Sequence, residues 1–239
     1  PNVTAKNGDT IPNPLRDLRV RKALTLAVDR NAIADNVMEG LAVPTNQIVA
    51  EGFGGYHEGI AVPDFDPAKA KKLLAEAGYP NGFNLTIHAT NDRYVNDAKL
   101  AQAIAQMYAQ VGVDVKVETM PVAVYYGKAR GHEFAMCQIG WATATGESSA
   151  ILSPALRKGK RNNYGRWENA EFNTVIKAAL STVNLEEYRA GLARATEIVA
   201  EEIPIIPTHN QVAVWAARKG LTYGATANEA TLAEAVSAE

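Results

Sequence analysis

Hydrophobic and polar positions follow two different periods along the chain, and these periods predict the order of its helices and strands. Residues 83–88 and 113–117 are apolar at every second position, which is typical of strands. Between them, residues 99–111 carry apolar side chains at the spacing of an amphipathic helix. The order strand, helix, strand predicts a crossover connection, and therefore an α/β fold with helices covering a sheet.

The same two patterns recur elsewhere in the chain. The clearest helix starts at the Asp66 cap and Pro67 and stops at Gly78. Residues 41–63 are rich in Gly and Pro and predict a loop, and residues 219–239 form a tail of small residues. Further helices are predicted after Pro14 up to residue 29 and at 31–38, 122–130, 169–182 and 185–201, and further strands at 134–139 and 211–215.

Composition narrows the kinds of partner that the protein can bind. A net charge of −2 provides no general attraction to nucleic acid or to an anionic membrane. The basic run at residues 157–161 lacks an aromatic platform, so we interpret it as a solvated loop and expect no nucleic-acid partner. Cys137 is the only cysteine, which excludes an intramolecular disulfide, and we place it in the strand at 134–139 as a small core residue.

Sequence signatures of catalysis and of cofactor binding are absent. The chain contains neither a glycine-rich phosphate-binding motif nor Gly-x-Ser-x-Gly nor His-Glu-x-x-His. Its four histidines lack the spacing of metal ligands. We therefore expect no catalytic residues, no metal and no cofactor, and we predict a binding protein in preference to a hydrolase or transferase.

Two loops carry side chains suited to binding a ligand, and each follows a predicted strand, where α/β sheets present their sites. In residues 91–94, Arg93 offers a planar fork for a carboxylate, and Tyr94 adds a hydroxyl and an apolar ring. The alternative for Arg93 is an exposed side chain without a function. Tyr125 and Tyr126, on a predicted short helix, are either further walls of the site or core residues.

The second loop spans residues 140–149. Small residues follow Trp141 and allow a ligand to approach the backbone closely, and Thr143 and Thr145 add hydroxyl groups. Glu147 is the acidic residue of this loop. The alternative for Trp141 is a position in the core.

Six segments in this order resemble one protein family, the solute-binding proteins of ABC transporters in the dipeptide, oligopeptide and nickel class (extracellular solute-binding protein family 5). The segments are residues 18–33, 66–83, 110–113, 139–141, 163–172 and 200–207. The resemblance implies the carboxyl-terminal lobe of a two-lobe, hinge-closing fold of the type II periplasmic-binding-protein kind, with a mixed sheet flanked by helices. By this resemblance, residues 1–17 are a truncated lead-in segment and 18–204 the ligand-binding lobe, while 205–239 form a return strand and a tail that packs on the amino-terminal lobe missing from this chain.

The resemblance also implies a function. It predicts a periplasmic or lipid-anchored protein that captures a peptide or another carboxylate-bearing solute between two lobes and delivers it to a membrane permease. Arg93 falls where such proteins hold the ligand carboxylate, with Tyr94, Tyr125 and Trp141 beside the ligand. Ala144 replaces the Asp that usually pairs with a peptide amino group, which argues against peptide specificity. The alternative function is a ligand-sensing or interaction domain of a regulatory protein.

Overall fold

A mixed sheet forms the centre of the larger part of the molecule. The computed structural model describes residues 1–143, 145–225 and 230–238. In this part of the chain β4 (Phe83–Thr90) pairs in parallel with β5 (Asp114–Met120) on one side and with β6 (Met136–Cys137) on the other. Next to β6, β4 also pairs antiparallel with β1 (Val3–Ala5), which continues into β2 (Thr10–Ile11). The predicted α/β class with a mixed sheet is confirmed.

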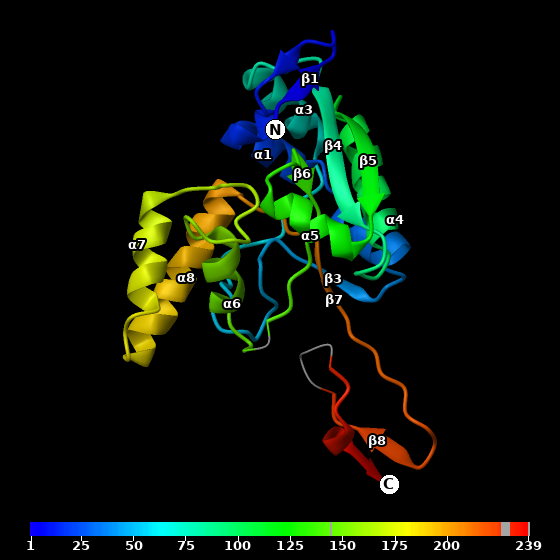
Figure 1. Cartoon of the computed structure of the whole chain (residues 1–239), viewed down its shortest axis with the longest axis vertical. Coiled ribbons are helices and arrows are strands. Elements are labelled where there is room, and N and C mark those ends of the chain that lie inside the picture. The colour runs from blue at the N-terminus through cyan, green and yellow to red at the C-terminus, as the bar shows by residue number, and fades with distance from the viewer. Residues whose placement is uncertain (144, 226–229, 239) are drawn as a thin grey trace.

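Helices enclose this sheet and complete its core (Figure 1). They are α1 (Leu18–Leu26), α3 (Pro67–Glu76), α4 (Asp97–Ala109) and α5 (Val122–Arg130). The Asp66 carboxylate accepts a hydrogen bond from Lys69 N at 2.8 Å, which confirms the predicted cap of α3. Large side chains of the core are Val20, Leu24, Ile33, Leu74, Phe83, Leu85, Ile87 and Tyr108. A Cβ on Gly82 would lie 1.8 Å from Gly112 O, so the turn before β4 requires glycine.

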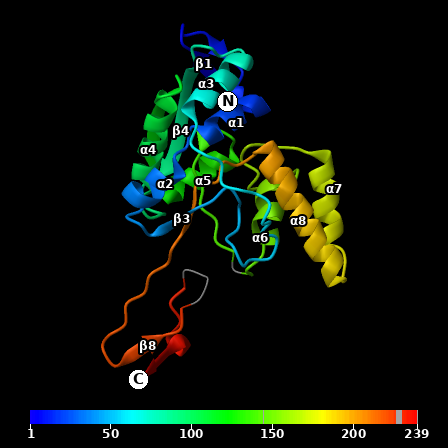
Figure 2. The same ribbon diagram turned by 180° about the vertical axis from the view of Figure 1, so that it is seen from behind.

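A second hydrophobic cluster holds a helical unit beside the sheet. The long helices α7 (Ala170–Ala179) and α8 (Leu185–Glu202) lie side by side in both views (Figures 1 and 2). Between them and the sheet lie α6 (Ser149–Ile151) and a π-helical turn (Leu152–Leu156). Buried side chains of this cluster include Leu152, Phe172, Ile176, Leu192 and Ile198. The molecule therefore has two cores, joined by connecting segments.

The guanidinium of Arg30 ties these connecting segments together. Arg30 begins the short α2 (Arg30–Ala32), is only 3% exposed and contacts four backbone carbonyls. Its Nε donates to Thr45 O at 2.9 Å and to Pro207 O at 3.0 Å, and its Nη1 donates to Thr25 O at 3.1 Å and to Val28 O at 3.4 Å. Residues 45 and 207 adjoin β3 (Ala42–Pro44) and β7 (His209–Gln211), which pair antiparallel. One buried side chain thus fixes the crossing point of two segments distant in sequence.

Several predicted boundaries are wrong. The first helix, expected up to residue 29, is divided into a 3-10 turn (Pro14–Arg16) and α1, because Asp17 is extended and caps α1 with its carboxylate. The second, expected at 31–38, is α2 followed by a π-turn (Ile33–Val37), and the Asp29 carboxylate caps it. The strand expected at 134–139 is reduced to β6, because the chain then leaves the sheet. Two residues of the loop after β6 form backbone hydrogen bonds with Gly54. Gly54 N donates to Gly146 O at 2.9 Å, and Ser148 N donates to Gly54 O at 2.7 Å.

The carboxyl-terminal segment also differs from the expected pattern. The strand predicted at 211–215 is instead β7, which ends at Gln211. The chain then runs as an extended arm to a hairpin of β8 (Leu221–Tyr223) and β9 (Val236–Ala238), with a 3-10 turn (Ala233–Ala235) before β9. Figures 1 and 2 show this arm projecting away from both cores.

Acidification below neutral pH is expected to destabilise the fold through two histidines. Burial lowers the pKa of His88 and of His209. His88 stacks on Phe134, and its Nε2 lies 3.2 Å from a Glu118 carboxylate oxygen, which offsets part of the effect, while Lys128 adds to it. An unfolded histidine titrates at about 6.5 and so binds more protons than the folded one just below that pH, where stability falls as pH falls.

Thermal unfolding midpoints measured from pH 7.5 to pH 5 test this expectation, since about 6.5 is the unfolded histidine value. The midpoint of the wild type should fall across this range, and the variant His88→Gln/His209→Gln should show a shallower fall. Parallel curves for the two proteins would contradict the assignment.

Candidate functional site

The loops that follow β4, β5 and β6 meet at one edge of the sheet. Because these strands are parallel, their carboxyl ends lie on the same side, where α/β proteins bind ligands. Residues 91–96 follow β4, Pro121 follows β5, and residues 138–148 follow β6. The two loops predicted to carry the site are therefore neighbours, although some fifty residues separate them in sequence.

The ring of Tyr94 joins these loops. Its hydroxyl donates to Gly140 O at 2.9 Å and also shares a hydrogen bond with the hydroxyl of Tyr126. Burial, aided by this hydrogen bond to Tyr94, raises the pKa of Tyr126, so its hydroxyl keeps its proton near neutral pH. A Cβ on Gly140 would lie 2.6 Å from the Tyr94 ring, so the loop after β6 can pack here because residue 140 has no side chain. We call Tyr94, Tyr126 and Gly140 the tyrosine cluster.

The backbone under Tyr94 is fixed by Asp97 at the start of α4. Asp97 is 5% exposed, and its Oδ2 accepts from Thr90 Oγ1 at 2.8 Å and from the backbone N–H groups of Arg93 and Tyr94 at 3.3 Å. Asp92 Oδ1 accepts from Val122 N at 2.7 Å and links the same loop to α5. The loop is thus held in place by buried polar groups, which reduces the entropy lost when a ligand binds.

Arg93 and Trp141 are the chain neighbours of the tyrosine cluster, one in each loop. The Arg93 side chain is exposed, and its guanidinium carbon lies 4.9 Å from the centre of the Tyr94 ring. Trp141 directly follows Gly140 and is partly buried against the second hydrophobic cluster. The arrangement offers a cationic fork able to bind a carboxylate bidentately, beside aromatic surface for an apolar group.

The other predicted site residues take different positions. Tyr125 is fully buried, and its hydroxyl lies 2.6 Å from Gln138 O and 3.0 Å from His88 O, so it supports the site from beneath. Thr143 is 8% exposed, and Thr145 is exposed. The Glu147 carboxylate accepts a hydrogen bond from the Tyr188 hydroxyl on α8. Ala144 lies outside the described residues.

Sequence reasoning did not single out Asp97, and it named Tyr126 only together with Tyr125, as a further wall or a core residue. Tyr126 was paired with Tyr125 as a possible wall, and only the exposure of the two rings distinguishes them. Asp97 has a weak sequence signal, because an acidic residue at the start of a helix ordinarily serves the helix alone.

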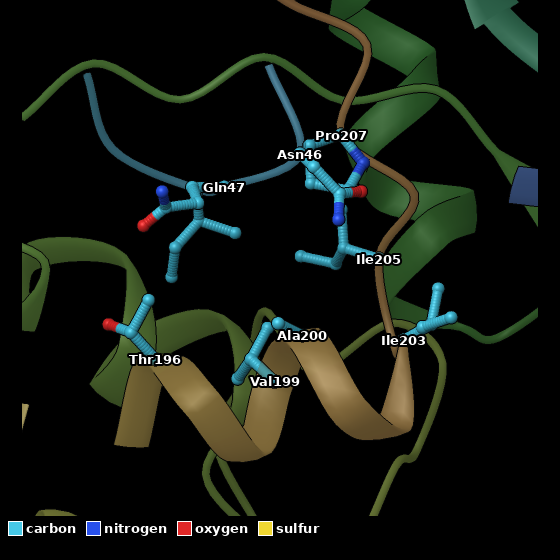
Figure 3. Close-up of a pocket in the computed structure, with 9 residues that line it drawn as sticks. Asn46, Gln47, Thr196, Val199, Ala200, Ile203, Ile205 and Pro207 are labelled. Atoms are coloured by element: carbon cyan, nitrogen blue, oxygen red, sulfur yellow. The ribbon is translucent and has the colours of Figure 1, made fainter. Parts of the chain in front are cut away.

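A small gap beside α8 does not provide an alternative solute site. It lies between the segments at Asn46–Gln47 and Ile205–Pro207 and the helix residues Thr196, Val199 and Ala200 (Figure 3). Its volume of about 10 Å³ holds at most about one water molecule. This gap is therefore an imperfectly packed junction at the segments that Arg30 holds.

The described residues contain no group of three or more His, Cys, Asp or Glu side chains arranged to hold a metal ion. Among them, no helix combines the length and apolar character that crossing a membrane requires.

Known proteins resemble this chain in sequence and in structure. Heme-binding protein A of Haemophilus influenzae is 32% identical over 219 residues, which are 88% of this chain and 40% of that protein. Glutathione-binding protein GsiB of Salmonella typhimurium is 31% identical over 230 residues, which are 92% of this chain and 43% of that protein. The structure of HbpA2 from Haemophilus parasuis matches the whole chain and 47% of its own length, with a TM-score of 0.83 at 26% identity. The chain thus spans about two fifths of the length of these curated relatives.

Residues 2–163 match the sequence profile of bacterial extracellular solute-binding proteins, family 5, in its middle region. This match covers more than half of the chain, and it includes the sheet, the tyrosine cluster and the loop that carries Arg93. The resemblance noted from six sequence segments is confirmed. The chain belongs to the family 5 bacterial extracellular solute-binding proteins.

Proposed function

We propose that the protein containing this chain is the binding component of an ABC import system, and that it captures a small solute at the edge formed by β4, β5 and β6. One observation carries the proposal: the tyrosine cluster joins the two candidate loops, and the Arg93 guanidinium lies against the Tyr94 ring of this cluster. The relatives named above are called binding proteins, which supports binding over catalysis as the role of this edge.

We propose that this edge is one wall of a cleft whose other wall belongs to a second lobe. The curated relatives are more than twice as long as the part that this chain matches, which leaves room for such a lobe. The arm from residue 212 onward carries exposed apolar side chains, among them Val214 at 67% exposure, and we expect residues 205–239 to pack on that lobe. Residues 18–204 then form most of the ligand-binding lobe, and residues 1–17, expected to lead into it, add β1 and β2 to its sheet. Solute bridging both lobes would favour the closed state.

The recognised group of the solute is expected to be a carboxylate. Arg93 presents the guanidinium that binds such a group, and both glutathione and heme, the ligands in the names of two relatives, carry carboxylates. Glu147, the acid nearest to Trp141 in its loop, is engaged by Tyr188 on α8. Recognition of a free amino group is therefore expected to contribute less than recognition of the carboxylate.

The cellular setting follows from this role. We propose a periplasmic or lipid-anchored extracellular location, in agreement with the extracellular family, and a membrane permease as the partner that accepts the solute.

Removing the guanidinium of Arg93 tests the proposal. In the full-length protein, with the co-purifying solute identified by mass spectrometry, Arg93→Ala should weaken binding by about 1–3 kcal/mol, because a charge-assisted hydrogen bond is lost. Isothermal titration calorimetry measures the effect, and Arg189→Ala, at an exposed position on α8, is the matched control. Equal affinities for wild type and Arg93→Ala would remove Arg93 from the site.

A further inference from the structure

A concave basic surface lies between the end of α5 and the loop that precedes α7. We call it the basic hollow, and its volume is about 360 Å³. The charged or ionisable side chains of its basic lining are Arg130, His132, Lys158, Lys160, Arg161 and Arg166. Part of this set is the basic run that sequence analysis interpreted as a solvated loop, and the fold adds the residues from α5 and from position 166 to it.

The charge of the basic hollow is strongly unbalanced. Among its described lining residues five are Lys or Arg, and Glu168 is the only carboxylate. Glu168 forms an ion pair with Lys158, which leaves the remaining cations without a carboxylate in the lining. The whole chain, by contrast, carries a net charge of −2. Positive charge concentrated in a concavity attracts anions and raises their local concentration.

The loop that carries these cations is held in one conformation. The buried Asn163 donates from Nδ2 to Trp167 O at 2.8 Å and accepts from Trp167 N at 3.1 Å. His132 and Arg166 both have positive φ values, 56° and 51°, which non-glycine residues rarely adopt. The His132 conformation ends α5, because Glu133 N donates to Lys128 O at 3.2 Å across it, as in a helix C-cap, and this fixes the lining at the end of the helix.

The guanidinium of Arg130 is incompletely hydrogen-bonded. Its Nε is buried and has no hydrogen-bond partner in the described part of the chain. Its guanidinium carbon lies 5.7 Å from the centre of the Tyr126 ring, so the basic hollow adjoins the tyrosine cluster. A buried N–H group destabilises the protein unless a ligand or a water molecule accepts a hydrogen bond from it.

We propose that the basic hollow is a second binding site, specific for a compact anion with two or more negative charges, such as a phosphate ester or a polycarboxylate. Arginine forks bind both groups bidentately. The volume lies within the range of about 300–1,000 Å³ found for small-molecule sites. The inference depends on none of the residues proposed to hold the transported solute, so it stands whether or not that proposal holds.

Calorimetry with two separate probes, sodium pyrophosphate and sodium citrate, tests the proposal in the full-length protein. At least one probe should bind, and raising the ionic strength to about 0.15 M should weaken it. The exposed double variant Lys160→Gln/Arg161→Gln should weaken binding about tenfold or more, because two charge-assisted contacts are lost. Lys177→Gln/Arg189→Gln removes the same charge from the exposed surfaces of α7 and α8 and should leave binding unchanged.

The outcomes distinguish a phosphate ester from a polycarboxylate, and they distinguish the basic hollow from the solute site at Arg93. Binding of pyrophosphate alone indicates a phosphate ester, and binding of citrate alone indicates a polycarboxylate. The site is overturned if neither probe binds, or if both double variants weaken binding equally. It is also overturned if Arg93→Ala removes the binding of the probe, because the anion would then occupy the proposed solute site.

Discussion

Replacing Arg30 by alanine is expected to lower the free energy of unfolding by several kcal/mol, because each buried carbonyl left without a donor costs about 1–3 kcal/mol. The guanidinium of Arg30 donates hydrogen bonds to four backbone carbonyls, at residues 25, 28, 45 and 207. The substitution removes this donor, so these buried carbonyls lose the hydrogen bonds that it makes. Burial lowers the pKa of Arg30 to about 10, so the guanidinium is charged at neutral pH and is stabilised there by these carbonyl dipoles.

Chemical denaturation measures this loss, with two further variants as references. Arg30→Lys keeps the charge but loses the planar fork, and it should fall between the wild type and Arg30→Ala. Arg189→Ala, at an exposed position, should change stability little. If Arg30→Ala were as stable as Arg189→Ala, Arg30 would not hold the connecting segments.

Placing alanine at position 140 is expected to reduce solute affinity, because an overpacked position forces its neighbours to move, at a cost of about 1–3 kcal/mol when they keep their places. The new Cβ would lie 2.6 Å from one atom of the Tyr94 ring and 2.9 Å from another. The ring must move, which breaks its hydrogen bonds to Gly140 O and Tyr126 and shifts Arg93 with it. The effect should appear in binding calorimetry more than in stability, because the ring lies at the edge of the sheet.

Gly127→Ala is the matched control for this substitution. Gly127 lies on α5, next to Tyr126, and a Cβ there would meet no atom within 4 Å. Its affinity for the solute should equal that of the wild type. A Gly140→Ala protein that binds as tightly as Gly127→Ala would show that the tyrosine cluster does not shape the solute site.

Local patterns explain which parts of the fold were predictable. Short stretches of sequence contain the whole signal for β4 and β5 (alternation), for the start of α3 (the cap at Asp66) and for α4 (its apolar face). The structure contains all of these elements. The break at Asp17 could not be predicted from periodicity alone, because Asp17 interrupts an otherwise continuous apolar pattern by capping α1, whereas the break after residue 29 was predicted.

Long-range contacts explain what was missed. Arg30 binds backbone carbonyls up to 177 residues away, and carbonyls carry no signature in a sequence. The ring of Tyr94 meets Gly140 only because β4 and β6 are parallel neighbours, so each loop was predicted as a candidate but their contact was not. In the same way, Arg130 and Arg166 join the basic run at residues 157–161 only in the folded chain.

A crystal structure of the full-length protein with its co-purified solute tests the central claim most directly. We predict that the solute lies against the Tyr94 and Trp141 rings, with a carboxylate within hydrogen-bond distance of the Arg93 guanidinium. Solute bound on another surface, with residues 91–96 and 138–148 free of contact, would contradict the account.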